Sequence, residues 1–343
     1  MTDILRISLA QMNPTVGAVA ANANLVREAR RRAAADSADI VMLSELFLSG
    51  YPPEDLVLKP AFQEACRNAA EKLAAETADG GPAVLLGTPW VEEGKLYNAV
   101  CLLDGGKVAA TRYKADLPNY SVFDEKRVFA PGRAQPPVEF RNLRLGLPIC
   151  EDIWTSAVTE CLAEAGADIL LVPNGSPYEH NKQDVRYNLV RDRVRETGRP
   201  AVYLNQVGGQ DELVFDGASF AVNGDGTIPL QMPAFRAHQV TTTWRRAGNN
   251  GWRCDASEIA KLPEELESIY QAMMLGLRDY VNKNRFPGII LGLSGGIDSA
   301  ISAAVAVDAL GADRVRAFML PSPYTSRDSI EDAAKCAELL GIV

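Results

Sequence analysis

The chain has 343 residues, 47% hydrophobic and 23% charged, so it can bury a substantial core and is neither a fibre nor a disordered tail. The 35 Lys and Arg residues against 44 Asp and Glu residues give a net charge of −9, which argues against binding to nucleic acid or an anionic membrane. Six cysteines without C-x-x-C spacing indicate reduced thiols, and no apolar run reaches the roughly 18 residues that span a bilayer, so we expect a cytoplasmic protein. With two histidines, a His-rich metal site is disfavoured, and acid–base chemistry is expected from carboxylates or lysine.

Short apolar runs alternate with helical patterns along the first ninety residues, an order that predicts an α/β architecture. Leu25, Val26, Ala29 and Ala33 share one helical face, which predicts that their helix covers one side of a sheet. Strands are expected at residues 4–10, 40–43 and 84–88, and helices at residues 22–35 and 61–75.

Two hairpin signals interrupt this alternation and predict a mixed sheet. The runs YNAVCLLD and KVAATRYK are joined at Gly105 and Gly106, and a turn from Asn223 to Gly226 follows the run ASFAV. These elements predict one domain over residues 1–245. Its remaining strands are expected at residues 143–149, 169–173 and 201–205, and its remaining helices at residues 157–165 and 184–197.

Residues 246–262 are expected to form a linker, because they carry Gly and Asn and show no sustained period. A second unit is then expected over residues 263–343. Pro263 and the acidic residues after it mark a helix start. The run FPGIILGLSGGIDSAISAAVAVDAL follows as strand, glycine-rich turn and helix, and a further strand completes a βαβ unit.

Three strand-like runs each end beside a chemically capable residue, at Glu45, Lys114 and Cys150. A glutamate can act as a general base, a lysine can stabilise an oxyanion, and a cysteine thiolate can attack an amide or nitrile carbon. The run after Cys150 opens a helix, and a helix N-terminus is expected to lower the pKa of this thiol. Together the three residues form an acyl-transfer set without histidine, although each alone also fits a core cysteine or a solvated charge.

The strings around these residues are SELFLSGYPPEDL at Glu45, YKADLPNYSVFDEKRVFAPG at Lys114 and LGLPICEDIW at Cys150. They resemble the nitrilase superfamily of carbon–nitrogen hydrolases, and more narrowly the glutaminase domain of the glutamine-dependent NAD synthetase family. The resemblance implies an α-β-β-α sandwich. It also implies that Glu45 is the general base, Cys150 the nucleophile that forms a γ-glutamyl thioester, and Lys114 the group that holds the oxyanion.

The same resemblance implies a pocket for glutamine. Glu125 matches a second glutamate near the attacked carbon, and the alternative is a surface acid paired with Lys126 or Arg127. His180 is expected to be a satisfied or exposed loop residue rather than a catalytic one. The residues expected to line the pocket or contact glutamine are Tyr120, Phe123, Glu125, Glu151, Ser176 and Lys182.

A glycine- and serine-rich loop, LGLSGGIDSA, opens a helix in the second unit. Glycines let the backbone approach phosphate, although the loop alone also fits a turn that caps a helix, and no lysine follows as in the Walker pattern. SGGIDS resembles the pyrophosphate loop of N-type ATP pyrophosphatases, and MLPSPYTSRDSIEDAAKCAELLGI extends the likeness to the NAD synthetase family. The resemblance implies a Rossmann-like doubly wound domain, with Asp298 as a Mg²⁺ ligand. The residues expected to hold ATP phosphates are Ser294, Gly295, Gly296, Ile297, Asp298 and Ser299.

The two resemblances together predict glutamine-dependent NAD synthesis, in which ammonia from glutamine attacks deamido-NAD that ATP has activated as an adenylate. The expected partners are L-glutamine, ATP with Mg²⁺, deamido-NAD and further copies of the chain in a homo-oligomer, while the glutaminase needs no cofactor. With two expected strands, residues 263–343 are predicted to be an incomplete part of the second domain. Two alternatives stay open: a stand-alone amidase, nitrilase or carbamoylase, and a nucleotide-binding assembly module with an inactive hydrolase.

Overall fold

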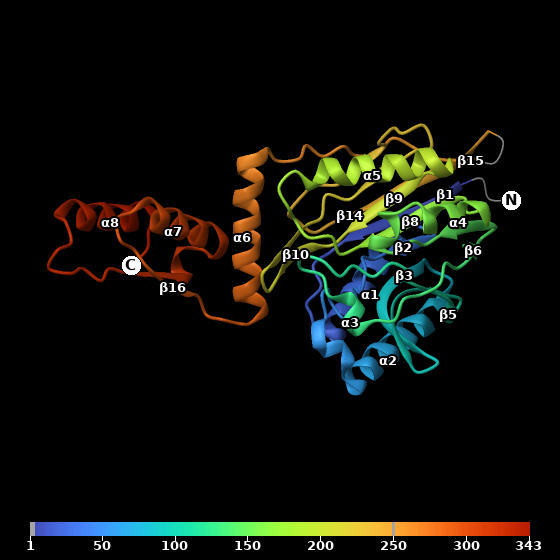
Figure 1. Cartoon of the computed structure of the whole chain (residues 1–343), viewed down its shortest axis with the longest axis horizontal. Helices are drawn as coiled ribbons and strands as arrows, with labels where there is room; N and C mark the ends of the chain where they lie inside the picture. The colour runs from blue at the N-terminus through green and yellow to red at the C-terminus, as the bar shows by residue number, and fades with distance from the viewer. Residues whose placement is uncertain (1–3, 249–250) are drawn as a thin grey trace. The chain divides into compact units, whose positions relative to one another are not determined.

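Two mixed β-sheets with helices on their outer faces form the first of two units in this computed structural model, which describes residues 4–248 and 251–343 (Figure 1). The first unit extends to residue 262 apart from residues 209–214. Those six residues belong to the second unit, together with residues 263–343.

The first sheet has seven strands in the order β15-β14-β1-β2-β3-β4-β5. β1 pairs in parallel with β2 and antiparallel with β14, so the sheet is mixed, as the hairpin signals predict. Its strands are β1 (Ile4–Gln11), β2 (Ile40–Met42), β3 (Ala83–Glu92), β4 (Lys95–Asp104), β5 (Lys107–Tyr113), β14 (His238–Ala247) and β15 (Gly251–Cys254).

The second sheet has six strands in the order β13-β12-β9-β8-β7-β6, with parallel pairs at its centre and antiparallel pairs at both edges. The predicted turn from Asn223 to Gly226 joins β12 to β13, as expected. The strands are β6 (Val138–Phe140), β7 (Leu143–Gly146), β8 (Ile169–Asn174), β9 (Ala201–Asn205), β12 (Phe220–Val222) and β13 (Leu230–Gln231).

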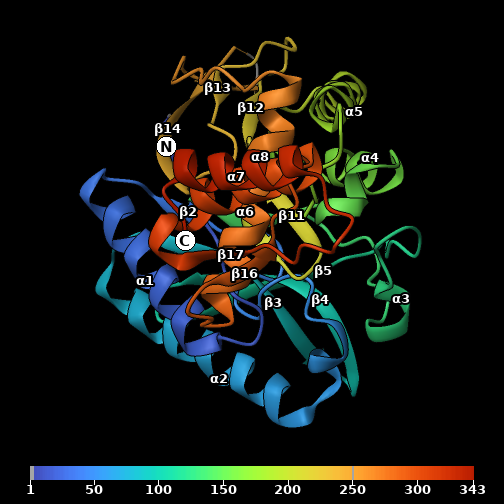
Figure 2. The ribbon, with the colours of Figure 1, turned by 90° about the vertical axis from the view of Figure 1, so that its left-hand side faces the viewer.

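Three apolar layers hold the four-layer sandwich together. One core cluster joins the inner faces of both sheets, with Ile7 from the first and Leu171 from the second fully buried. A second cluster packs α1 (Val19–Ala35) and α2 (Pro60–Glu76) on the first sheet, and these helices lie side by side in Figure 2. A third packs α4 (Ala157–Glu164) and α5 (Lys182–Thr197) on the second sheet. The α-β-β-α sandwich is confirmed. Shorter helical segments are α3 (Glu125–Val128) and 3₁₀ turns at Glu54–Leu58, Thr77–Asp79 and Cys150–Ile153.

The segment expected to be a linker, residues 246–262, instead contains strand. β15 pairs with the end of β14, with Trp244 opposite Cys254, and it forms one edge of the seven-stranded sheet. Trp252 and Cys254 are buried and Arg253 between them is exposed, which is the period of two of a half-buried strand. The first unit therefore extends past the predicted boundary at residue 245.

The second unit is built from α6 (Glu265–Lys283), β16 (Ile289–Gly292), α7 (Ile297–Leu310), β17 (Val315–Phe318) and α8 (Arg327–Leu340), with a 3₁₀ turn at Ala312–Arg314. β16 and β17 pair in parallel, which confirms the βαβ unit. Figure 2 shows α7 beside α8. The tip of the hairpin between β10 (Val207–Gln210) and β11 (Leu213–Asp216) packs on α6, where Gly209 N donates to Asp279 Oδ2 at 2.7 Å.

No helix within residues 4–248 or 251–343 combines the length and the apolar character that crossing a membrane requires.

Candidate active site

Cys150 lies at a sharp turn four residues after β7 ends, where the chain enters the 3₁₀ segment Cys150–Ile153. Its φ is +46°, a left-handed conformation that is uncommon for any residue but glycine and that marks functional turns. Asp152 holds the turn, because its Oδ2 accepts from Ile149 N at 2.9 Å and its Oδ1 accepts from Ala115 N at 2.9 Å. The second of these bonds ties the cysteine turn to the residue that follows Lys114.

A buried ionic cluster adjoins this turn. Lys114 Nζ contacts Glu45 Oε1 at 2.7 Å and Glu125 Oε1 at 2.9 Å, and the side chains of Lys114 and Glu45 are fully buried. Burial alone would lower the pKa of Lys114, but the charges of Glu125 and Glu45 raise it well above the ordinary lysine value. Lys114 therefore stays protonated between the two carboxylates.

The chain brings these residues together from three different connections. Glu45 follows β2, Lys114 follows β5 directly, and Glu125 opens α3. The backbone of Ser44 passes so close to β3 that a Cβ on Gly87 would lie 2.3 Å from the Ser44 carbonyl oxygen. Gly175, after β8, donates its N–H to Glu45 Oε2 at 2.9 Å. Glu45 and Lys114 are thus in direct contact, and both lie close enough to Cys150 for their charges to act on its thiol.

The thiol of Cys150 has a pKa well above the ordinary cysteine value, because burial raises it and the charge of Glu45 raises it further. Lys114 and the N–H of Gly175 oppose the increase without cancelling it. The expectation that a helix N-terminus lowers this pKa is wrong, since the segment after Cys150 is a four-residue turn with two carboxylates nearby. A protonated thiol requires a base before it can attack a carbon.

Glu125 is not the surface acid that pairs with Lys126 or Arg127. It is 5% exposed, and its Oε1 accepts from Lys114 and from Tyr51 OH at 2.9 Å. Burial raises the pKa of Glu125, and the charge of Lys114 lowers it only in part. The site therefore holds a second carboxyl group that retains a proton more readily than a surface glutamate.

A hollow of about 690 Å³ is lined by Ala115 and Glu151, the chain neighbours of Lys114 and Cys150, and by Tyr120. On its wall, Tyr120 OH donates to the carboxylate of Glu151 at 3.0 Å. Phe123 is not among the lining residues, but its ring packs edge to face on that of Tyr120 with centroids 5.5 Å apart. Burial raises the pKa of Glu151. This hollow offers an acid, aromatic surface and backbone groups to a small polar ligand.

Ser176 and Lys182 lie at different depths. Ser176 is buried, and its N–H donates to Asn205 Oδ1 at 2.9 Å. Lys182 opens α5 and pairs with Glu179, while the nearby His180 is exposed. The structure thus brings Ser176 into the buried network and leaves Lys182 at its rim.

Sequence reasoning did not find the groups that orient the predicted residues. Asn98 Nδ2 donates to Glu45 Oε1 at 2.7 Å, and Tyr51 reaches Glu125. Arg186 is fully buried, contacts Asp216 Oδ2 at 2.8 Å and donates to Ser176 O at 2.9 Å. A signal existed for Arg186, because it shares a buried helical face of α5 with Val190 and Val194.

Comparison with known proteins supplies the family. Residues 6–247 match the carbon–nitrogen hydrolase family, which is more than half of the chain. The chain belongs to the carbon–nitrogen hydrolase family. Residues 269–343 also match the NAD synthase family.

Individual relatives resemble the chain over both of its units. It is 49% identical to the glutamine-dependent NAD(+) synthetase of Rhodobacter capsulatus, over 99% of this chain and 61% of that protein. The solved glutamine-dependent NAD+ synthetase of Acinetobacter baumannii, in complex with ADP, has a TM-score of 0.91 and 38% identity over 99% of this chain and 64% of that one. The chain therefore spans less than two thirds of the length of either relative.

The sandwich alone resembles a simpler enzyme. A variant of the amidase from Nesterenkonia sp. AN1, with acrylamide added at its active-site cysteine, has a TM-score of 0.62 and 26% identity. The match covers 69% of this chain and 92% of the amidase.

The residues of the second unit that are predicted to hold phosphates lie after β16 and in the first turn of α7. Ser299 Oγ donates to Gly296 O at 2.9 Å and accepts from Ser294 N at 3.2 Å. Gly295 has a φ of +81°, and a Cβ there would lie 2.3 Å from the Ser329 carbonyl oxygen, so only glycine fits. Asp298 is exposed in the first turn of α7, next to Ile297. Among the residues with described positions, no three His, Cys, Asp or Glu side chains gather as metal ligands would.

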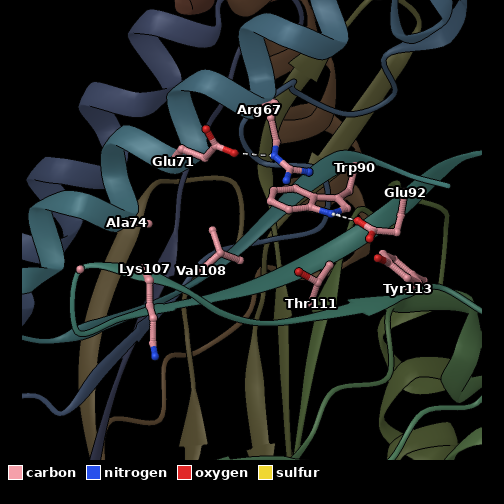
Figure 3. A pocket seen from close by; sticks show the side chains of 10 residues that line it. Arg67, Glu71, Ala74, Trp90, Glu92, Lys107, Val108, Thr111 and Tyr113 are labelled. Carbon is pink, nitrogen blue, oxygen red and sulfur yellow. Dashed lines mark hydrogen bonds and ion pairs between the residues drawn. The ribbon is translucent and has the colours of Figure 1, made fainter. Parts of the chain in front are cut away.

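A second hollow in the first unit, of about 500 Å³, is lined by residues of α2, β3, β5 and the turn before β5 (Figure 3). The guanidinium of Arg67 stacks 3.6 Å from the ring centre of Trp90, and its Nε donates to Glu71 at 2.7 Å. Trp90 Nε1 donates in turn to Glu92 at 3.3 Å. None of the predicted site residues lines this hollow.

Proposed function

We propose that this chain supplies the glutamine-hydrolysing unit of a glutamine-dependent NAD synthetase and the beginning of its ATP-binding unit. The observation that carries the proposal is the buried Glu45–Lys114–Glu125 cluster beside a cysteine in a strained turn. The related synthetases from Rhodobacter capsulatus and Acinetobacter baumannii support the proposal, because their similarity covers 99% of the chain.

In the proposed reaction, Cys150 Sγ attacks the side-chain carbonyl carbon of glutamine as Glu45 takes the thiol proton. The carbonyl oxygen becomes an oxyanion, which the ammonium group of Lys114 stabilises. Glu45 returns the proton to the amide nitrogen, the C–N bond breaks and ammonia leaves, so a γ-glutamyl thioester remains. Water activated by Glu45 then cleaves the thioester to glutamate and free thiol.

The hollow lined by Tyr120 and Glu151 is the proposed glutamine pocket. Phe123 would support the Tyr120 ring, and Glu151 would face the α-amino group of glutamine. Ser176 and Lys182 would contact its amino-acid end, with the cation of Lys182 suited to a carboxylate. Glu125 would lie near the attacked carbon, where its raised pKa suits a group that donates a hydrogen bond.

The loop of the second unit is the proposed ATP site. Its Ser294 to Gly296 backbone and the start of α7 would face phosphates, and Ile297 and Ser299 would complete the loop. One carboxylate among phosphate oxygens suits Mg²⁺, so Asp298 would hold that ion, which neutralises phosphate charge when bound. In the complete enzyme, ammonia would displace AMP from adenylated deamido-NAD. We also propose a cytoplasmic location and a homo-oligomer.

The test compares glutamine with simple amides. Release of glutamate and ammonia is measured with glutamine, propionamide and acetamide, and Cys150→Ala serves as the inactive control. We expect kcat/KM for glutamine to exceed that for propionamide by about a hundredfold or more, because the pocket pairs with the amino-acid end. Equal or higher activity on propionamide would favour the stand-alone amidase, which the Nesterenkonia likeness supports. No hydrolysis of any amide would favour the inactive module.

A further inference from the structure

Asn98 lies on β4 between the two carboxylates of the cluster and is 1% exposed. Its Nδ2 donates to Glu45 Oε1 at 2.7 Å and to Glu125 Oε2 at a limiting 3.5 Å. The opposite orientation of this amide would turn its carbonyl oxygen toward two carboxylates, so the observed orientation is the favourable one. Asn98 is therefore a neutral donor that serves both acids.

The hydrogen-bond inventory of Glu45 distinguishes its two oxygens. Oε1 accepts from Lys114 Nζ and Asn98 Nδ2, both at 2.7 Å, so both of its lone-pair positions are used. Oε2 accepts only Gly175 N among the described residues, at 2.9 Å, and one of its positions stays open. Gly175 N, which donates to Oε2, also lowers the pKa of the Cys150 thiol, so Oε2 is the oxygen of Glu45 that shares a neighbour with the sulfur.

We propose that Asn98 is a positioning residue that saturates Glu45 Oε1 and leaves Oε2 as the oxygen that takes the Cys150 proton. This inference rests on the proposed function and deepens it. Lys114 cannot saturate Oε1 alone, because its ammonium group fills only one of the two lone-pair positions of that oxygen. Asn98 fills the second position from a different direction and, together with the Gly175 N–H on Oε2, fixes the plane of the carboxylate.

The inference predicts a change in the pH profile. A carboxylate that has lost a donor holds a proton more readily, so the acid limb of the profile moves to higher pH. Loss of a hydrogen bond to a charged group corresponds to a shift of about one to two pH units. The titratable or charged groups that face Glu45 from the surrounding elements, and that stay in place in the variant, are Tyr51, Lys114, Glu125, Cys150 and Glu151.

Two variants and one control test the inference. Asn98→Ala removes the donor, and Asn98→Asp keeps the shape while it replaces a donor by an acid, so a folding failure of one leaves the other to be measured. Asn223→Ala is the control, because Asn223 is also 1% exposed but donates to the carbonyl of Cys254. Tryptophan fluorescence in urea reports whether each variant is folded.

The first readout is kcat/KM for glutamine against pH, and the second is the rate of Cys150 alkylation by iodoacetamide against pH, followed by mass spectrometry. We expect both acid limbs to move to higher pH in the Asn98 variants and to stay in place in Asn223→Ala. Unmoved limbs in a folded Asn98 variant would overturn the inference. If the natural chain does not hydrolyse glutamine, the proposed function fails, but the alkylation profile still decides the role of Asn98.

Discussion

Replacing Lys114 by methionine is the sharpest perturbation of the buried cluster, because it removes the charge and keeps most of the side-chain volume. At an effective dielectric constant of about 20, each of the contacts of 2.7 and 2.9 Å contributes a Coulomb attraction of about 6 kcal/mol. Desolvation of one ammonium and two carboxylates offsets most of this attraction. The net contribution of the cluster to the free energy of unfolding is therefore small, but removing Lys114 alone costs much more than that contribution.

Lys114→Met leaves Glu45 and Glu125 buried without a cation. Stranding a buried charge in this way typically costs about 3–5 kcal/mol of unfolding free energy, and we expect that loss at pH 7.5. At pH 5 the stranded carboxyl groups take up protons, so the loss becomes smaller. The triple variant Glu45→Gln, Lys114→Met, Glu125→Gln removes all three charges and should recover most of the stability.

Urea unfolding followed by tryptophan fluorescence measures these differences in unfolding free energy for the first unit, which contains the cluster. The four tryptophans all belong to the first unit, so their signal does not mix the unfolding of the two units. A loss that is equal at pH 5 and pH 7.5, or a triple variant as unstable as Lys114→Met, would refute the reasoning. Either result would mean that packing, and not stranded charge, determines the cost. The tryptophans are Trp90, Trp154, Trp244 and Trp252.

Three further predictions concern the chemistry. Glu45→Gln should lower glutamine hydrolysis to below about a hundredth of the natural rate and confine Cys150 alkylation by iodoacetamide to alkaline pH, because a thiol with a raised pKa has lost its base. An alkylation rate that depends on pH as in the natural chain would contradict this prediction. Prolonged treatment with EDTA should leave glutamine hydrolysis intact, since base, nucleophile and cation are all side chains; a loss that a divalent ion reverses contradicts it. The 343-residue chain should form no NAD from ATP, Mg²⁺, deamido-NAD and ammonium, because the two paired strands of its second unit are too few to enclose a dinucleotide and ATP. Formation of NAD in that assay would contradict this prediction.

Local periodicity was enough to predict the layers of the sandwich. The predicted apolar face of α1 is the buried one, since Val26, Ala29 and Ala33 are fully buried. Glycine pairs likewise predicted the hairpin between β4 and β5. Such features depend on residues within a few positions of one another, where the helical and strand periods act directly.

The orienting groups of the site depend on contacts between distant parts of the chain. Gly175 is 130 residues from Glu45, and Asn98 is 53 residues from it, so no local pattern joins them. The positions become neighbours only after the sheets have paired and stacked. Asn98 nevertheless carries a detectable signal in the sequence, because it is a polar residue next to the apolar run of β4.

The segment at residues 246–262 shows a different failure. Its Gly and Asn residues are typical of loops, and the alternation of buried Trp252, exposed Arg253 and buried Cys254 spans only three residues, which is too short to predict a strand. The four residues of β15 form a strand because they pair with β14. Edge strands of this length are decided by tertiary context rather than by intrinsic preference.

The state of the catalytic thiol follows from the surroundings of Cys150 and not from its position at a turn. Burial raises the pKa of Cys66 and of Cys101 to about 12, and Cys150 also has a raised pKa, so acidity does not set it apart from these buried thiols. What differs is the adjoining carboxylate of Glu45, held by a cation and two N–H donors. A resting thiol of this kind resists chance alkylation and oxidation, because the thiolate is the reactive form. In the proposed mechanism its proton leaves to Glu45, so we expect reactivity to be confined to a substrate that reaches both groups together.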